Sequence, residues 1–346
     1  MIATTPQNVI IKIVLILILV LLMSCDNKTD HIKKSAESIQ ATRNLNSKLN
    51  IVTLQTQWLH QAQFAGFYVA HKKGFYNNYG IDVRIQMGGP DNPSSVALQN
   101  NKANFVTMFL TSALREIDKE SKIVNIAQLS QKSSMLLVAK KSKGITQIKD
   151  LNGKRIGLWV NDFREPSITF LNKNNIKATI VPISWTVNVL NQDVVDVMNM
   201  MIYNEFDILI NTGINQNELT IFPLADLGVN IPEDGIYCLK DYYNQNQELC
   251  HDFAEASMEG WNYALNHEEE TLSIVLEYLR EAHLPANIPH QRWMLKKVKE
   301  AVLAKPEQYG KLTEKDYNSA INMLIENGVI SKSVPYKDFI GYAVSK

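Results

Sequence analysis

From Ile51 onward the chain alternates short apolar strands with helical segments, and this alternation restricts the possible folds more than any other feature. Residues 81–87 show the strand signal clearly, because apolar and polar side chains alternate there with a period of two. Strands that alternate with helices are typical of an α/β fold built on parallel sheets. With 346 residues, the chain is long enough for two such lobes.

Two places in the sequence indicate where the chain crosses between the lobes. The apolar strands at 123–129 and 135–139 follow each other without a helix between them, which indicates the first crossing. The segment Pro232-Glu233-Asp234-Gly235 interrupts the pattern again and indicates the return. We therefore expect residues 50–140 and 236–346 to form lobe 1, and residues 141–235 to form lobe 2.

The N-terminus differs from the body in composition. Its run 13–23 (IVLILILVLLM) is wholly apolar but short for a bilayer core of about 30 Å, and it has the size of a signal-peptide core. It ends in Leu22-Met23-Ser24-Cys25, which resembles a bacterial lipobox. That resemblance implies cleavage before Cys25 and acylation of its thiol, for example with palmitate; an uncut membrane anchor is the alternative. We expect a signal peptide over 1–24, a polar tether over 25–49, and an extracytoplasmic body held at the membrane.

Charge and motifs exclude several classes of function. The chain has 35 basic and 35 acidic side chains, which argues against a nucleic-acid partner. Its seven His are scattered and give no metal-ligand pattern, and hydrolase and phosphate-loop motifs are missing. We expect neither metal nor cofactor. Cys238 and Cys250 remain open between a disulfide bridge and two free buried thiols.

Several short blocks along the body carry a family resemblance. They are residues 57–70 (QWLHQAQFAGFYVA), Lys73-Gly74-Phe75-Tyr76, Gly80-Ile81-Asp82-Val83, Gly88-Gly89-Pro90, the turn at 150–157, Tyr203-Asn204-Glu205 and Glu233-Asp234-Gly235. Their order and spacing resemble the substrate-binding proteins of nitrate, sulfonate, taurine and thiamine-precursor ABC importers, and especially the branch for thiamine pyrimidine precursors.

This resemblance implies a type II-like periplasmic-binding-protein fold, whose two α/β lobes close on a ligand in the cleft between them. It also implies a monomer that delivers an aminopyrimidine used in thiamine biosynthesis to an ABC permease and its ATPase. A sulfonate, taurine or nitrate ligand is the alternative, and so is a sensor that signals through a partner without transport.

Candidate ligand contacts follow because ligands of open α/β sheets bind beyond the carboxyl ends of the strands. Together with the resemblance, this rule gives Trp58, Phe64, Gly88, Gly89, Thr111, Ser112, Trp159, Asn161, Tyr203 and Glu205. An indole at Trp58 can stack on a flat ring, with a core position as the alternative. Gly88 and Gly89 permit close backbone approach or form a simple turn. Thr111 and Ser112 donate to the ligand or cap a helix.

Glu205 is the main polar candidate. A carboxylate can pair with the amino group and protonated ring nitrogen of an aminopyrimidine, whereas it repels nitrate or a sulfonate. A charge that favours a helix N-terminus is the alternative role for Glu205. We expect Asp234 to fix the hinge turn rather than to contact the ligand.

An enzymatic role is the last alternative. Some eukaryotic relatives of this fold make the thiamine pyrimidine from their own histidine and pyridoxal phosphate, using a Schiff-base lysine, a histidine and a cysteine-rich run. In this chain those positions fall at Met108, at Ser112 and near 236–239, where only Cys238 is present. Because Met108 cannot form a Schiff base, we expect a binding protein rather than an enzyme.

Overall fold

The computed structural model describes residues 49–160 and 164–342. The expected signal peptide, the tether, the lipid site at Cys25 and the candidate Asn161 lie outside these residues. The chain divides into residues 1–50 and a compact unit of residues 51–346, which is the body described below.

The first lobe is built on a five-stranded sheet with the strand order β2-β1-β3-β10-β4. Its strands are β1 (Asn50–Gln55), β2 (Ile81–Gln86), β3 (Phe105–Phe109), β4 (Ile123–Gln128) and β10 (Asp234–Leu239). Strand β1 pairs in parallel with β3, whereas β10 runs antiparallel to both β3 and β4. The strand that returns from the second lobe is therefore inserted into the first sheet.

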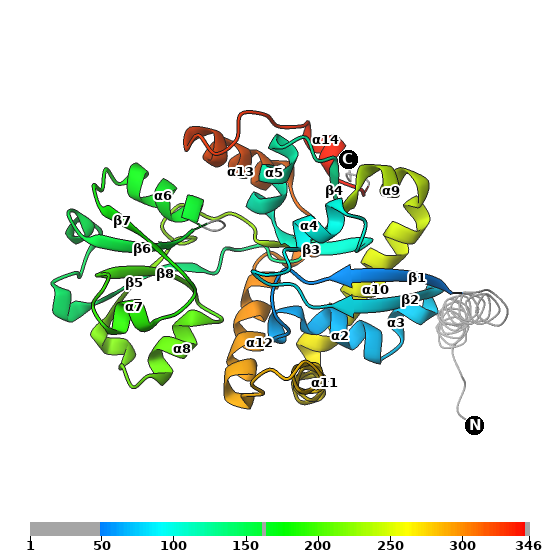
Figure 1. The fold of residues 1–346 in the computed structure, drawn as a ribbon, viewed down its shortest axis with the longest axis horizontal. Coiled ribbons are helices and arrows are strands. Elements are labelled where there is room, and N and C mark those ends of the chain that lie inside the picture. The colour runs from blue at the N-terminus through cyan, green and yellow to red at the C-terminus, as the bar shows by residue number, and fades with distance from the viewer. Residues whose placement is uncertain (1–48, 161–163, 343–346) are drawn as a thin grey trace, which may run out of the picture. The chain divides into compact units, whose positions relative to one another are not determined.

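Helices cover the first sheet, with α4 and α5 on one side and α2 and α3 on the other (Figure 1). The α-helices of this lobe and of the C-terminal region are α2 (Ala65–Lys72), α3 (Phe75–Asn78), α4 (Ser94–Gln99), α5 (Leu110–Asp118), α9 (Lys240–Gln245), α10 (Gln247–Asn266), α11 (Glu268–Glu281), α12 (Ile288–Val302), α13 (Glu314–Glu326) and α14 (Tyr336–Phe339). Helices α2 and α10 approach closely, because a Cβ atom at Gly260 would lie 2.3 Å from the Gly66 carbonyl oxygen.

The second lobe has its own five-stranded sheet with the order β7-β6-β8-β5-β9. Its elements are β5 (Met135–Lys140), β6 (Arg155–Trp159), α6 (Arg164–Lys173), β7 (Thr179–Ile183), α7 (Asn188–Asn191), β8 (Val197–Met201), α8 (Glu205–Asn211) and β9 (Leu219–Pro223). Strand β6 is parallel to β7 and β8, whereas β5 is antiparallel to β8 and β9. Both sheets are thus mixed, and the predicted two-lobe α/β fold is confirmed.

One strand lies in a different lobe from the one we expected. Residues 50–140 were assigned to lobe 1, but the last of them, Met135–Lys140, form β5 in the second sheet. The physical reason is pairing, because β5 lies between β8 and β9 and all its residues but Lys140 are buried there. The first crossing therefore occupies the few residues between β4 and β5.

The two crossings between the lobes are held together by Glu233. Its Oε1 accepts hydrogen bonds from Ser133 Oγ and from the Ser134 backbone N–H, each at 2.8 Å. Its own backbone N–H donates to Ser130 Oγ at 2.8 Å. The segment that leaves lobe 1 and the segment that returns to it therefore lie side by side. We expected Asp234 to fix a hinge turn. The structure instead places it at the start of β10.

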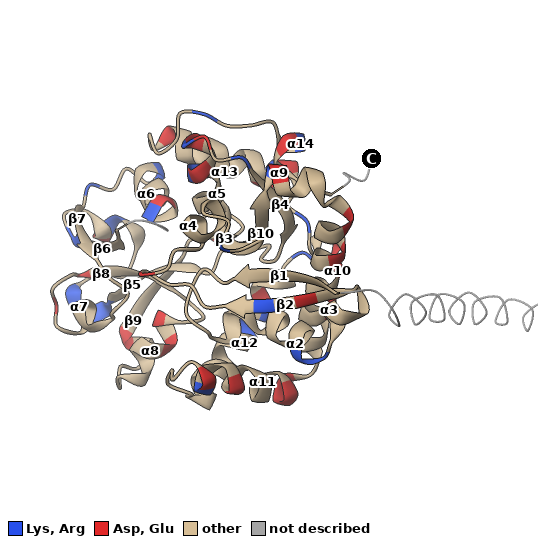
Figure 2. Ribbon diagram, turned by 45° about the vertical axis from the view of Figure 1, so that its right-hand side comes forward, with Lys and Arg blue, Asp and Glu red and all other residues tan. Residues whose placement is uncertain are grey.

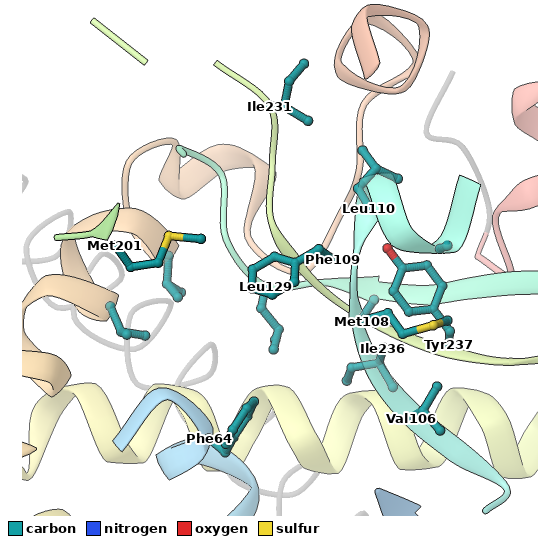
Figure 3. Packing of buried hydrophobic residues seen from close by; sticks show 14 of the residues in the cluster. Phe64, Val106, Met108, Phe109, Leu110, Leu129, Met201, Ile231, Ile236 and Tyr237 are labelled. Atoms are coloured by element: carbon teal, nitrogen blue, oxygen red, sulfur yellow. The ribbon is translucent and has the colours of Figure 1, made fainter. Parts of the chain in front are cut away.

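The main hydrophobic core is continuous with this hinge region. It combines side chains of the first sheet with Met201 and Ile231 from the second lobe, and Figure 3 shows these residues with Phe64 and Leu129. Cys238 and Cys250 are buried in the same core as free thiols.

The surface of the body has mixed charge. Acidic and basic residues are interspersed over the helices of both lobes (Figure 2), in keeping with their equal totals. Within residues 49–160 and 164–342, no helix has both the length and the apolar character that crossing a bilayer requires.

Candidate functional site

A cleft of about 400 Å³ is lined by residues from both sheets. Its first wall comes from the segments after β1, β2 and β3, and its second wall from the segments after β6, β7 and β8. The lining thus consists of the last residues of these strands and of the segments that follow them, at the carboxyl ends where ligands of open α/β sheets bind. The volume lies in the range of small-molecule sites, which are about 300–1,000 Å³.

The structure brings most of the predicted contact residues into this cleft. The lining includes Trp58, Gly89, Ser112, Trp159, Tyr203 and Glu205. They come from segments that are far apart in sequence and meet only because the two sheets face each other. Their role as ligand contacts stays a prediction.

Three predicted residues do not line the cleft. Phe64 is 1% exposed and packs in the core. At Gly88 an added Cβ would lie 2.0 Å from the Thr56 carbonyl oxygen, so this glycine permits backbone contact between the ends of β1 and β2. Thr111 is buried in the first turn of α5, and that helix begins at Leu110, so neither Thr111 nor Ser112 is its N-cap residue.

Trp185 is a cleft residue that the sequence interpretation missed. It lies two residues after β7, its side chain is 55% exposed, and its ring centroid is 5.7 Å from that of Trp58 with an interplanar angle of 80°. The two indoles, which belong to different lobes, therefore meet edge to face at the cleft. The rule that located Trp58, a side chain just past a strand end, would also have located Trp185.

Glu205 is buried at the second wall. Its Oε2 accepts a hydrogen bond from the Met201 backbone N–H at 3.0 Å, and its Oε1 accepts one from Asn204 Nδ2 at 2.9 Å. Burial raises the pKa of this carboxyl from 4.5 to about 7, against the opposing effect of these hydrogen bonds. A cationic or N–H-rich ligand group would therefore favour the ionised carboxylate.

Helix α12 supports the Glu205 loop from outside the cleft. His290 Nε2 lies 3.1 Å from Asn204 Oδ1, and His290 Nδ1 lies 2.6 Å from Asp207 Oδ2. Because Asn204 also donates to Glu205, the imidazole fixes the side chain that holds the buried carboxyl. This contact joins the C-terminal helices to the second lobe.

The cleft lining contains one charged side chain, that of Glu205, and no Lys, Arg or His among the described residues. The remainder is aromatic, apolar or neutral and polar, and it includes three glutamines at 57, 61 and 63. Within the described residues, no group of three His, Cys, Asp or Glu is arranged to hold a metal ion. The walls thus have negative but not positive side-chain charge.

The positions that would carry synthase chemistry also line the cleft. Met108 is on β3 and Ser112 is on α5, and they are the positions at which the sequence resemblance implies a lysine and a histidine in the related enzymes. A thioether cannot form a Schiff base, and a hydroxyl cannot replace an imidazole as a general base at neutral pH.

Two mixed α/β sheets, joined by adjacent crossings and facing a cleft at their strand ends, define the periplasmic-binding-protein fold. Within that class, the chain belongs to the family described as NMT1/THI5 like, which it matches over residues 61–271.

Two curated proteins show the range of the relatives. The chain is 26% identical over 278 residues to the riboflavin-binding protein RibY of Chloroflexus aurantiacus, and the match covers 78% of each chain. It is 28% identical over 116 residues to the 4-amino-5-hydroxymethyl-2-methylpyrimidine phosphate synthase of Schizosaccharomyces pombe, and this match covers 33% of each.

Solved structures share the fold at low sequence identity. The periplasmic aliphatic sulphonate binding protein SsuA of Escherichia coli aligns with a TM-score of 0.67 at 10% identity, over 85% of this chain and 92% of that one. The ligand binding component of an ABC-type import system from Staphylococcus aureus aligns with a TM-score of 0.62 at 12% identity, over 84% and 96%.

Proposed function

We propose that this protein is the extracytoplasmic solute-binding component of an ABC importer and that it captures a flat nitrogen heterocycle between its lobes. The ligand that fits the site best is an aminopyrimidine precursor of thiamine, and the partners are a permease and its ATPase. The observation that carries the proposal is the cleft lining, which combines aromatic side chains with a single buried carboxyl and contains no Lys, Arg or His among the described residues.

The aromatic side chains support a planar ligand. Trp58 and Trp185 present indoles from the two lobes, and Trp159 and Tyr203 line the same cleft. Aromatic faces stack on flat rings with a gain of about 0.5–1.5 kcal/mol per pair beyond the area that they bury. Because the indoles belong to different lobes, a ring held by both would favour the closed arrangement.

The charge of the site disfavours the sulfonate, taurine and nitrate alternatives. An anion would have to lose its hydration beside Glu205 without a cationic side chain in the described lining to compensate. An aminopyrimidine instead offers an amino group and a ring nitrogen that can be protonated, and both can donate to the Glu205 carboxylate.

Riboflavin is the second candidate ligand. The relative RibY, 26% identical over 78% of this chain, is a riboflavin-binding protein, and the flavin ring system is also flat. A cleft of about 400 Å³ is large for a single pyrimidine ring, and this observation favours testing the larger ligand beside the smaller one.

Synthesis of the pyrimidine is disfavoured as a function. The match to the Schizosaccharomyces pombe synthase covers a third of each chain, and Met108 and Ser112 line the cleft at the positions where the resemblance implies the lysine and histidine of the enzymes. The sequence Leu22-Met23-Ser24-Cys25, which resembles a lipobox, further supports export and membrane attachment, which suit a protein that delivers ligand to a permease.

The proposal is tested by calorimetric titration of residues 50–346, which contain the compact unit, after unfolding and refolding have removed any bound ligand. The ligands are 4-amino-5-hydroxymethyl-2-methylpyrimidine, riboflavin and taurine. Saturable binding of either heterocycle with a dissociation constant of about 1 µM or lower, roughly −8 kcal/mol, supports the proposal if taurine gives no heat of binding. Binding of taurine alone would contradict it.

The role of Glu205 is tested by Glu205→Gln, which keeps the shape of the side chain and removes its charge. We expect the aminopyrimidine to lose about 1.5–3 kcal/mol of binding free energy, the usual value of a hydrogen bond to a charged group. Glu116→Gln is the matched control, because Glu116 is also buried but does not line the cleft. An unchanged affinity in Glu205→Gln would remove this residue from the ligand contacts.

A further inference from the structure

Three glutamines of the first wall are connected to one carboxylate. Gln57 Nε2 donates to Asp234 Oδ1 at 2.7 Å, and Gln63 Nε2 donates to both Asp234 oxygens at 3.1 and 3.0 Å. Gln63 Oε1 in turn accepts a hydrogen bond from Gln61 Nε2 at 2.6 Å. All three glutamines line the cleft, whereas Asp234 lies behind them and is 7% exposed.

An ionised carboxylate can only accept hydrogen bonds, and this property fixes the orientation of the amides. Asp234 requires the nitrogen of Gln57 and of Gln63 to point toward it, so the oxygen of each amide must point elsewhere. The Gln63 oxygen then orients Gln61 in the same sense. The buried charge of Asp234 therefore determines whether the glutamine amides present oxygen atoms or N–H groups to the cleft.

Gln57 shows the consequence most clearly. Its Oε1 is inaccessible to solvent and has no hydrogen-bond partner within the described chain, although the residue lines the cleft. A buried oxygen without a partner is unfavourable, so a ligand N–H group that reaches Gln57 Oε1 would gain a hydrogen bond that the free protein lacks. The nitrogen of the same amide cannot compete for that position while it donates to Asp234.

Among the described residues, the charged or titratable groups that interact with Asp234 are an acid and two phenols. Glu233 precedes it in the chain, and the phenols of Tyr203 and Tyr237 interact with its charge. Burial raises the pKa of Asp234 to about 6, while its hydrogen bonds from Gln63 and Gln57 oppose the rise. At neutral pH the carboxyl is therefore mostly ionised and accepts from both amides.

We propose that Asp234 is a positioning residue that sets the first wall of the cleft to accept hydrogen bonds, so that the bound ligand must present an N–H group to Gln57 Oε1. With Glu205 as an acceptor on the opposite wall, the site selects heterocycles that carry amino groups over counterparts that carry a carbonyl oxygen in place of the amino group. This inference rests on the proposed function for the identity of the ligand but not for the orientation of the glutamines.

The ligand test uses Asp234→Asn, which keeps the shape and allows an amide N–H to face Gln57. The reoriented Gln57 would then offer its nitrogen to the cleft. We expect the ratio of affinities for 4-amino-5-hydroxymethyl-2-methylpyrimidine and its 4-oxo analogue to fall by roughly tenfold or more. Glu233→Gln, which alters the adjacent buried carboxyl, should leave the ratio unchanged. Equal losses for both ligands in Asp234→Asn would show a merely structural role and overturn the proposal.

A double-mutant cycle tests whether Asp234 acts through Gln57. In a Gln57→Met background, Asp234→Asn should have little further effect on the ratio, because the side chain that it orients is gone. A full tenfold effect of Asp234→Asn in that background would overturn the inference.

A second measurement needs no ligand and so separates this inference from the proposed function. In protein labelled with 15N-glutamine, the side-chain amide protons of Gln57 and Gln63 should have downfield chemical shifts. These chemical shifts should change as the pH falls through about 6, because Asp234 then takes up a proton. In Asp234→Asn, both the downfield position and the pH dependence should be lost. Gln57→Met assigns the Gln57 signal. Amide proton chemical shifts that change neither with pH nor in Asp234→Asn would refute the orienting role, even if a heterocycle binds. If no heterocycle binds but the signals respond, the proposed ligand class fails and the orienting role stands.

Discussion

We expect Glu233 to make the stability of the protein depend on pH, and replacing this residue should change that dependence. The side chain is 7% exposed, and its Oε1 accepts hydrogen bonds from Ser133 and Ser134. Burial, followed by the charge of Asp234, raises the pKa of Glu233 from 4.5 to about 8. The folded protein therefore keeps a proton on this carboxyl at neutral pH.

The sign of the effect follows from proton binding. Between about pH 4.5 and 8 the unfolded chain has released this proton while the folded protein still holds it. The free energy of unfolding therefore falls as the pH rises, by about 1.4 kcal/mol per pH unit from this group. Across the whole interval, Glu233 should lower the free energy of unfolding by about 5 kcal/mol, a large part of the 5–15 kcal/mol typical of folded proteins.

Glu233→Gln should remove this decline. The amide oxygen of the new side chain can accept from Ser133 and Ser134 as the carboxyl does, and it does not titrate. We expect urea unfolding of residues 50–346 to give similar stabilities for the two proteins near pH 5 and a more stable variant near pH 9, by several kcal/mol. Glu326→Gln, at an exposed position on α13, controls for a general charge effect. Curves of wild type and Glu233→Gln that stay parallel from pH 5 to pH 9 would refute the reasoning.

Three further changes test packing, ligand stacking and membrane attachment. Gly260→Ala places a Cβ atom 2.3 Å from the Gly66 carbonyl oxygen and should lower the free energy of unfolding by roughly 1–3 kcal/mol. An unchanged melting temperature would contradict the close contact between α2 and α10. Trp185→Ala should weaken heterocycle binding by about 0.5–1.5 kcal/mol in calorimetry and leave the melting temperature unchanged, and equal affinity would exclude stacking on this exposed indole. Cys25→Ala should move the full-length protein from the membrane to the soluble fraction, whereas retention would indicate an uncut anchor.

Much of the fold could be predicted from local periodicity, but the lobe to which β5 belongs could not. The strand signals of the first sheet appear in the sequence because their alternating or mainly apolar patterns resemble their burial. Strand β5 was assigned to the wrong lobe because a buried apolar run fits either sheet, and only its pairing with β8 and β9 decides between them. Local pattern does not encode that choice.

The site was partly predictable because it follows from topology. Side chains placed just after strand ends, such as Trp58 and Tyr203, reach the cleft because the carboxyl ends of the strands face it. The rule does not say which neighbour points inward, so Phe64 and Thr111 were included although both are buried beside the cleft. The partners of Asp234 were not predictable, because its link to Gln57 spans 177 residues of sequence.

Glu233 and Asp234 together show how one short segment can serve both the hinge and the cleft. Glu233 holds the crossing at Ser133 and Ser134, and the next residue, Asp234, orients Gln57 on the wall of the cleft. Glu233 lies immediately before β10 and Asp234 is its first residue, and the two carboxyls accept hydrogen bonds from different segments of the chain. Any rotation of the lobes that displaces the Glu233 contacts also displaces the backbone that carries Asp234. The residue that holds the crossing and the residue that orients Gln57 are therefore joined by a single peptide unit.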